Sequence, residues 1–324
     1  MKYYLAPLEG ITTYIYRRAY HRYFRPMDKY FTPFLVPHTK KDFNTREKNE
    51  ILPEHNVGMY LVPQILTNNA EDFLRTSKRL KEYGYEEVNL NLGCPSKTVV
   101  SKYRGSGFLA KPGELDRFLD EVYSKANVKV SIKTRIGKVS PDEFDDLLQI
   151  YNRYPIEELI IHPRVQKDFY KNTPNLDVFG YALKNSQNRV CYNGDIFTAE
   201  RAWNFRHQFP EEDSIMVGRG VIFNPCLTEE IEIFEKDMAE AGEIKTEGKR
   251  VDRKRVDRKR IRMFHDQLYH DYQEVNSGDK NVLFKMKELW CYMGYLFPEY
   301  EKQLKKIKKA EKLDRYEAAV NEIL

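Results

Sequence analysis

The chain has 324 residues, of which 41% are hydrophobic and 32% are charged, and it carries a formal net charge of +5. This length favours one large domain with an appendage or two medium domains. No run of 18 apolar residues occurs, and the opening MKYYLAPLEG lacks the apolar centre of a signal peptide, so neither a membrane span nor export is expected. We therefore expect a cytoplasmic protein.

Eight segments rich in Val, Ile, Leu, Tyr and Phe are predicted to be strands. In chain order they are 3–8, 29–35, 60–66, 86–92, 128–135, 158–164, 189–195 and 214–220. Helical periodicity predicts helices at 69–84, 114–126 and 141–154, whereas the segment 36–59 is loop-like. This alternation predicts an α/β fold, and eight repeats favour a (β/α)8 TIM barrel over an open doubly wound sheet.

Two apolar stripes at helical spacing follow the last predicted strand, and we expect them to form a helical core. The first contains Ile261, Phe264 and Leu268. The second contains Leu283, Met286, Trp290, Met293 and Phe297. The segment 277–280 (SGDK) separates the two stripes, and a third helix is expected over 300–324.

The strand pattern stops near residue 235, which suggests a domain boundary. We predict a barrel over 1–240 and a small all-helical domain over 245–324. Between Lys249 and Arg262, nine Lys or Arg residues stand against two Asp. Such a run could bind a polyanion, and a solvated helix face or linker is the alternative.

The four cysteines lie at least 35 residues apart, which excludes a CxxC-type metal site. Reduced thiols and no metal are therefore expected. Cys94 follows a predicted strand and lies in the turn Gly93-Cys94-Pro95, whereas Cys191, Cys226 and Cys291 are expected to be small buried residues.

Polar residues recur at the carboxyl ends of the predicted strands, which is where the active site of such a barrel lies. They are Gln64, Asn91, Cys94, Lys133, Arg135, His162, Arg164, Asn193 and Arg219. One such residue is ordinarily a cap or turn residue. Folding gains nothing from burying polar groups on six strands, so together they predict a functional site.

The last two strands end in NGD (193–195) and GRG (218–220), where glycines allow the backbone to approach a ligand. The loops after strands 7 and 8 are the usual phosphate site of this barrel, although ordinary tight turns are the alternative. No Walker or GxGxxG motif follows a first strand, which favours a phosphate-bearing cofactor in the barrel mouth. Gln64, Lys133 and His162 suit the polar edge of a flavin; a salt bridge for Lys133 and a core position for His162 are the alternatives.

Six motifs together resemble the tRNA-dihydrouridine synthase family. They are APLEGIT (6–12), NLNLGCP (89–95), IKTRIG (132–137), IIHPR (160–164), NGDI (193–196) and VGRG (217–220). The segment 284–298 also resembles part of that family's helical tRNA-binding domain. The resemblance implies a (β/α)8 barrel with FMN, a helical domain that binds tRNA, and NADPH-dependent reduction of the C5–C6 bond of particular uridines.

The resemblance also implies residue roles. Cys94, on a mobile turn, would give a proton to C5 of a flipped uracil after reduced FMN gives a hydride to C6, and an ordinary thiol is protonated at neutral pH as this requires. Asn91 would contact the uracil or the flavin, and Arg135 and Arg164 would face the substrate. The flavin ring would contact Ala6, Pro7, Gln64, Lys133 and His162. Its phosphate would contact Asn193, Gly218 and Arg219.

Two motifs depart from the family pattern, Leu8-Glu9 and the segment 105–110 (GSGFLA), so the uridine position is not transferred. Two rival functions stay open: an FMN barrel acting on a small molecule, and a non-catalytic tRNA-binding protein. The basic C-terminal part argues against the first, and Cys94 with the strand-end residues argues against the second. A monomer whose partners are tRNA and NADPH is expected.

Overall fold

The computed structural model describes residues 1–38, 43–241 and 257–324. They form two compact units. The barrel unit comprises Met1–Tyr14, Met27–Asp195 and Phe209–Gly218, and the helical unit comprises Ile15–Pro26, Ile196–Gln208 and Arg219–Leu324. The boundary predicted between 240 and 245 falls largely outside the described residues, and the two predicted domain ranges stay a prediction.

The barrel unit contains nine parallel strands in the order β3-β2-β1-β9-β8-β7-β6-β5-β4. Their bounds are β1 Lys2–Leu5, β2 Lys29–Phe31, β3 Leu61–Val62, β4 Gln64–Ile65, β5 Glu87–Leu92, β6 Lys129–Arg135, β7 Leu159–His162, β8 Val190–Tyr192 and β9 Ser214–Val217. Each of the eight predicted strands overlaps at least one of them.

The ring closes because the two strands at the ends of this order, β3 and β4, are separated only by Pro63. Proline has no backbone N–H and therefore interrupts the ladder, which splits one barrel strand into two. A bridge between Leu35 and Ile65 adds a further contact at this point. The predicted TIM-barrel fold class is confirmed.

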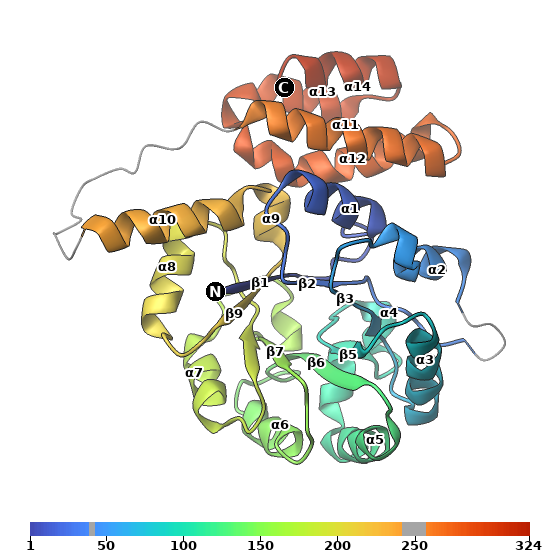
Figure 1. The fold of residues 1–324 in the computed structure, drawn as a ribbon, viewed down its shortest axis with the longest axis vertical. Coiled ribbons are helices and arrows are strands. Elements are labelled where there is room, and N and C mark those ends of the chain that lie inside the picture. Colours follow the sequence, from blue (N-terminus) through green and yellow to red (C-terminus); the bar gives the residue numbers. More distant parts are fainter. Residues whose placement is uncertain (39–42, 242–256) are drawn as a thin grey trace. The chain divides into compact units, whose positions relative to one another are not determined.

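Helices surround the strands, and in Figure 1 α3, α5, α6 and α7 lie outside the ring. The helices of this unit are α2 Thr45–Ile51, α3 Ala70–Glu82, α4 Lys97–Val100, α5 Pro112–Lys125, α6 Glu143–Tyr151 and α7 Leu176–Asn185. The three helices expected from periodicity are present. The expectation of a loop-like 36–59 was wrong for α2, which begins with a capping box between Asn44 and Glu47.

The two ends of the barrel differ in chemistry. Apolar side chains from six strands form a buried cluster that includes Tyr4, Phe31 and Met216. At the amino ends of the strands, the Lys29 ammonium lies 3.0 Å from a Glu87 oxygen and 3.1 Å from a Glu158 oxygen. These buried carboxylates have a partner there, which leaves the carboxyl ends of the strands for the candidate site.

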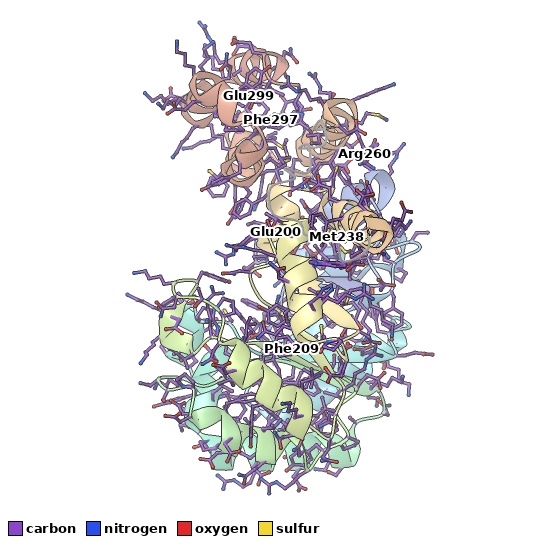
Figure 2. All side chains as sticks on the ribbon, turned by 90° about the vertical axis from the view of Figure 1, so that its left-hand side faces the viewer. Glu200, Phe209, Met238, Arg260, Phe297 and Glu299 are labelled. Carbon is purple, nitrogen blue, oxygen red and sulfur yellow. The ribbon has the colours of Figure 1, made fainter. Side chains whose placement is uncertain are left out.

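The helical unit contains α1 Tyr14–Tyr23, apart from its first residue, α8 Ala199–Gln208, α9 Arg219–Phe223, α10 Leu227–Ala241, α11 Arg258–Val275, α12 Asp279–Met293, α13 Glu301–Lys309 and α14 Leu313–Asn321. Figure 2 labels Glu200 on α8 and Met238 on α10, and these two helices pack against each other. No helix among the described residues is long and apolar enough to cross a membrane.

Both predicted apolar stripes are buried and belong to the core of the helical unit. Trp290 donates from its indole N–H to the Tyr316 hydroxyl at 2.9 Å, which joins α12 to α14. The single helix expected over 300–324 was wrong, because the chain leaves α13 at Ala310 and re-enters a helix at Leu313. The two short helices pack on each other and bury Ile307 and Val320, so tertiary packing decides the break.

Candidate active site

The thiol that prompted the functional prediction lies in a turn directly after β5. The Asn91 side-chain oxygen accepts hydrogen bonds from the backbone N–H groups of Gly93, at 3.1 Å, and Cys94, at 3.0 Å. A backbone N–H can only donate, so this contact fixes which end of the Asn91 amide is the oxygen. The Asn91 nitrogen therefore has to point the other way, into the barrel.

A chain of buried amides begins at that nitrogen. Asn91 Nδ2 donates to Gln64 Oε1 at 2.6 Å, Gln64 Nε2 donates to Asn89 Oδ1 at 2.8 Å, and Asn89 Nδ2 donates to Ser131 Oγ at 3.0 Å. Each bond fixes the orientation of the next amide, because an amide oxygen accepts and an amide nitrogen donates. We call Asn91, Gln64, Asn89 and Ser131 the amide chain; it links three neighbouring strands to the Cys94 turn.

The opposite side of the turn is also held. The Ser106 N–H and hydroxyl donate to the Cys94 carbonyl at 3.1 and 2.8 Å, and Arg135 Nε donates to the Gly93 carbonyl at 3.0 Å. Gly105 has φ +55°, and a Cβ there would lie 2.8 Å from the Cys94 carbonyl oxygen. Hydrogen bonds thus hold the turn on both sides, and its mobility stays a prediction.

The surroundings of the Cys94 thiol keep it protonated. Burial raises the pKa of this thiol above its ordinary value, and Glu9 acts in the same direction. The backbone at Ser96 and the cations Arg135 and Lys133 oppose this effect but do not overcome it. A protonated thiol can give a proton to a substrate, whereas metal binding or nucleophilic attack needs a thiolate.

Lys133 lies on β6 directly opposite Asn91 on β5. Burial, with the positive charge of Arg135 in addition, lowers the pKa of Lys133 to about 8. Among the described residues Lys133 has no ion-pair partner, so the salt bridge considered as its alternative is not present there. A lysine of this kind is available to an anionic group of a ligand.

His162 ends β7 and is buried. Its Nε2 atom lies 3.0 Å from Nη1 of Arg164. A guanidinium only donates, so Nε2 accepts and the neutral imidazole carries its proton on Nδ1. Arg164 also forms an ion pair with Asp195 and donates to the Lys171 carbonyl at 3.0 Å.

Arg135 and Arg164 are each only 1% exposed. Arg135 donates to the carbonyls of Gly93, Val165 and Phe169 at 3.0, 2.9 and 2.6 Å. The described contacts of both guanidinium groups are therefore with the protein itself, and their contact with substrate stays a prediction.

The remaining predicted cofactor residues of the barrel unit lie at the ends of β1, β8 and β9. The Ala6 N–H donates to the Val217 carbonyl at 2.8 Å, and a Cβ on Gly218 would lie 3.3 Å from the Ala6 Cβ. The Asn193 amide donates to the Met216 carbonyl at 2.8 Å, and Pro7 is partly exposed. Arg219 belongs to the helical unit, where its guanidinium lies 5.3 Å from the Phe197 ring centroid.

The carboxyl ends of the barrel strands thus gather amide, ammonium and imidazole groups on adjacent strands. A flavin presents acceptors and one N–H along its polar edge, and its reduced form is negative near N1. Gln64 and Lys133 supply donors of the required kind, so the residues present fit a flavin. The roles of the individual residues stay predictions.

The basic run could bind a polyanion or form a solvated helix face or linker, and its residues 249–256 lie outside the described part of the chain. The arginines that follow make contacts within the helical unit. Arg258 pairs with Glu299 at 2.9 Å, Arg260 with Glu229 at 2.7 Å and Arg262 with Asp266 at 2.7 Å. These pairs leave an RNA contact for the run untested.

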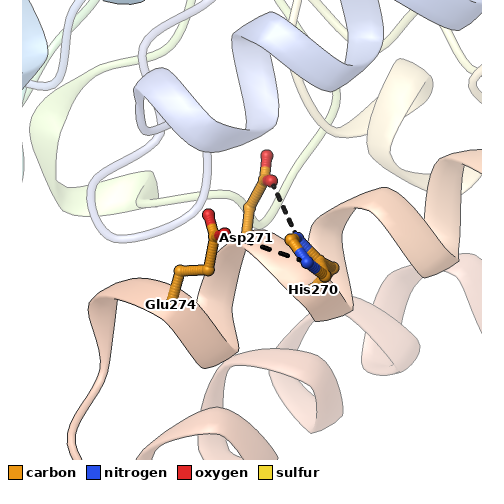
Figure 3. Close-up of side chains that lie close together, drawn as sticks. All are labelled: His270, Asp271 and Glu274. Carbon is orange, nitrogen blue, oxygen red and sulfur yellow. Dashed lines mark ion pairs between the residues drawn. The ribbon is translucent and has the colours of Figure 1, made fainter.

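In the described part of the chain, one group of side chains has metal-ligand spacing (Figure 3): His270, Asp271 and Glu274 on α11. His270 Nδ1 lies 3.7 Å from Asp271, and its Nε2 lies 3.8 Å from Glu274. Asp271 already accepts from Arg18 at 2.7 Å and from Gln267 at 2.8 Å. Because these donors occupy both carboxylate oxygens, we assign no metal, and the expectation of a metal-free enzyme stays a prediction.

Sequence reasoning missed four residues of the site: Asn89, Ser106, Gly105 and Ser131. Asn89 precedes Asn91 by two positions on one strand, and strand periodicity places both on the same face, so this signal was available.

Cys191 and Cys226 are buried as expected, but Cys291 is exposed and that expectation was wrong.

Comparison with known proteins decides the family. A family model described as dihydrouridine synthase (Dus) matches residues 4–321. The chain belongs to the dihydrouridine synthase family. It is 28% identical over 231 residues to the "Probable tRNA-dihydrouridine synthase" of Staphylococcus aureus (strain Mu50 / ATCC 700699), covering 68% of each chain. It is 27% identical over 236 residues to "tRNA-dihydrouridine synthase B" of Pasteurella multocida (strain Pm70), covering 72% of this chain and 70% of that protein.

Solved structures agree on the fold. Morphinone reductase is similar with a TM-score of 0.51 and 12% identity, over 72% of this chain and 86% of that chain. Histamine dehydrogenase from Rhizobium sp. 4-9 is similar with a TM-score of 0.55 and 10% identity, over 73% of this chain and 46% of that chain. The resemblance to the family and the expectation of an enzyme of this family are both confirmed.

Proposed function

We propose that this dihydrouridine synthase family member reduces uridines in tRNA to 5,6-dihydrouridine, with FMN in the barrel mouth and NADPH as reductant. The observation that carries the proposal is the fixed Cys94 turn beside Gln64 and Lys133 in a barrel of this family. The names of the Staphylococcus aureus and Pasteurella multocida relatives support tRNA as the substrate.

Cys94 is the proton donor in this proposal. Bound reduced FMN would supply the hydride for C6 of the uracil, and the thiol would give its proton to C5 from the other face. Burial favours this role because it raises the pKa of Cys94 and keeps the proton in place until transfer. Asn91 and Ser106 hold the turn on opposite sides, so the thiol is preorganised for an approaching base.

The other residues of the barrel unit would bind and orient. The Lys133 ammonium would offset negative charge on the flavin ring, and Gln64, fixed by the amide chain, would donate to the same ring. His162 would bond the ring edge, and Ala6 and Pro7 would line it through backbone atoms. Asn193, Gly218 and Arg219 would hold the phosphate.

The helical unit would bind tRNA outside the catalytic site. In the barrel unit, Arg135 and Arg164 would face the substrate. We also propose that the protein is a monomer and acts in the cytoplasm. RNA recognition of this kind depends on shape and backbone contacts, which a separate surface provides.

The test uses the purified chain loaded with FMN, NADPH, and tRNA that lacks dihydrouridine. Digestion and mass spectrometry should find dihydrouridine with the wild type and with Cys291→Ala, which removes an exposed thiol. Cys94→Ala should give at least about 100-fold less dihydrouridine, which is the effect expected for loss of a general acid. If a flavin-loaded wild type made no product from tRNA but oxidised NADPH with a small enone or uracil, the small-molecule rival would replace the proposal.

A further inference from the structure

The loop after β7, residues 165–172, contains two of the three non-glycine residues with positive φ in the described part of the chain. We call it the aromatic loop. Phe169 has φ +51° and ψ −100°, and Asn172 has φ +57°. Positive φ is costly for a residue with a side chain, and most of all for a bulky one. Such strain persists only where the surrounding structure enforces it.

Two buried arginines enforce this conformation. Arg135 donates to the carbonyls of Val165 and Phe169, and Arg164 donates to the carbonyls of Lys171 and Asn172. Burying a guanidinium costs free energy unless its donors are satisfied, and here the loop carbonyls satisfy many of them. The hydrogen bonds from these two arginines therefore stabilise the strained conformation of the loop.

The aromatic loop presents aromatic and basic groups to solvent. Phe169 is 41% exposed and Tyr170 is 50% exposed, although large apolar side chains are ordinarily buried. Lys167 and Lys171 are exposed beside them, and within the described residues neither side chain has a hydrogen-bond or ion-pair partner. Exposed rings with adjacent cations suit single-stranded nucleic acid, because bases stack on the rings and phosphates pair with the cations.

The position of the aromatic loop fits the same ligand. Arg135 donates to the Phe169 carbonyl of the loop and to the Gly93 carbonyl next to Cys94, so one guanidinium connects the loop with the Cys94 turn. The Tyr170 ring centroid lies 6.1 Å from the His162 ring and 5.6 Å from the Arg135 guanidinium. A strand that delivers one base to Cys94 has neighbouring nucleotides within reach of this loop.

We propose that the aromatic loop binds the nucleotides that flank the target uridine. Phe169 and Tyr170 stack on their bases, and Lys167 and Lys171 pair with their phosphates. The inference rests on the proposed function, in which RNA is the substrate.

The test measures the Kd of unmodified tRNA for the FMN-loaded full chain. Tyr170→Ala should raise Kd about 5- to 100-fold, the range for loss of one base–aromatic stack, and Tyr170→Phe should bind as the wild type does. Tyr181→Ala is the matched control, since Tyr181 is also an exposed tyrosine of the barrel unit but lies on α7. Replacing Lys167 and Lys171 by Ala should lower the slope of log Kd against log salt by about 1.4.

Phe169→Gly separates binding from stability. Glycine adopts positive φ without strain, so the urea midpoint of this variant should match or exceed that of the wild type. Its Kd for tRNA should nevertheless rise. A merely structural aromatic loop would give the reverse, with a lowered midpoint and an unchanged Kd.

Two results would overturn the inference. In the first, Tyr170→Ala and Tyr181→Ala bind tRNA equally well. In the second, Tyr170→Ala raises the KM for NADPH when oxygen replaces tRNA as the electron acceptor and leaves the tRNA Kd unchanged, which assigns the loop to the reductant. Dihydrouridine is assayed in parallel: tRNA binding that depends on Tyr170 without dihydrouridine formation would contradict the proposed function and leave the loop assignment standing.

Discussion

Replacing Asn91 by Asp tests whether the amide chain fixes the Cys94 turn. The two side chains have the same shape, so the substitution creates no cavity. A carboxylate can still accept from the N–H groups of Gly93 and Cys94, but it cannot donate to Gln64 Oε1, which lies 2.6 Å from the present nitrogen. Gln64 alone cannot rotate to compensate, because its nitrogen already donates to Asn89 at 2.8 Å. Compensation requires that Asn89 flips as well and that the Ser131 hydroxyl gives up its contact with the Val88 carbonyl to donate to Asn89.

The expected magnitude follows from these bonds. One buried acceptor loses its donor and faces a second oxygen, which costs about 1–3 kcal/mol, and a buried carboxylate adds to that. Urea unfolding should therefore show Asn91→Asp to be less stable than the wild type by about 1–3 kcal/mol or more. Asn68→Asp, at a partly exposed asparagine that bonds one carbonyl at 3.2 Å, is the control and should change stability little.

Thiol alkylation gives a second measure on the same variant. Mass spectrometry follows Cys94 and Cys291 in one sample, and the exposed Cys291 serves as the internal reference. Loosening of the turn should raise the ratio of Cys94 to Cys291 alkylation in Asn91→Asp. Unchanged stability together with an unchanged ratio would refute the view that the amide chain holds the turn.

Three further predictions concern other groups. Burial raises the pKa of Glu212 from 4.5 to about 7, so its stabilising contribution is complete below pH 4.5 and is lost as pH rises through about 7. Glu212→Gln keeps the oxygen that accepts from Ser214. Urea unfolding at pH about 8 should find this variant more stable than the wild type by about 1–3 kcal/mol. Equal pH dependence of the unfolding free energy in the two proteins would contradict this. Because the pKa of Lys133 is lowered to about 8, FMN affinity measured by fluorescence should fall above that pH, and Lys133→Gln should bind FMN about tenfold more weakly and without this fall. Trp290→Phe removes the bond to Tyr316 and should cost about 1–2 kcal/mol in unfolding without weakening tRNA binding; a weakened tRNA Kd at full stability would count against a core role.

Periodicity and composition predicted the barrel because each strand is a short apolar run and most connecting segments carry an amphipathic pattern. The helix α2 was missed since its segment is polar, although Asn44 and Glu47 form a capping box that is visible in the sequence. The break between α13 and α14 has no glycine or proline to announce it. There the docking of the two helices overrides local propensity.

The candidate site shows a different limit. The positions of Cys94, Lys133 and His162 could be predicted, because strand ends converge at one end of a barrel. The partners of Arg135 could not be predicted, because backbone carbonyls from two different loops accept from it. Every residue has a backbone carbonyl, so the sequence does not show which of them Arg135 contacts. The strain at Phe169 depends on the same contacts, and only the structure reveals it.

A single-turnover experiment shows whether Cys94 donates the proton. The enzyme is reduced by NADPH without oxygen and mixed with tRNA that lacks dihydrouridine, and the absorbance of oxidised flavin and the yield of dihydrouridine are followed together. We expect the flavin of the wild type to be reoxidised as dihydrouridine forms. The flavin of Cys94→Ala should be reduced by NADPH at the wild-type rate, but tRNA should reoxidise it at least about 100-fold more slowly. Reoxidation of Cys94→Ala by tRNA at the wild-type rate, or no reoxidation of the wild type, would contradict this expectation.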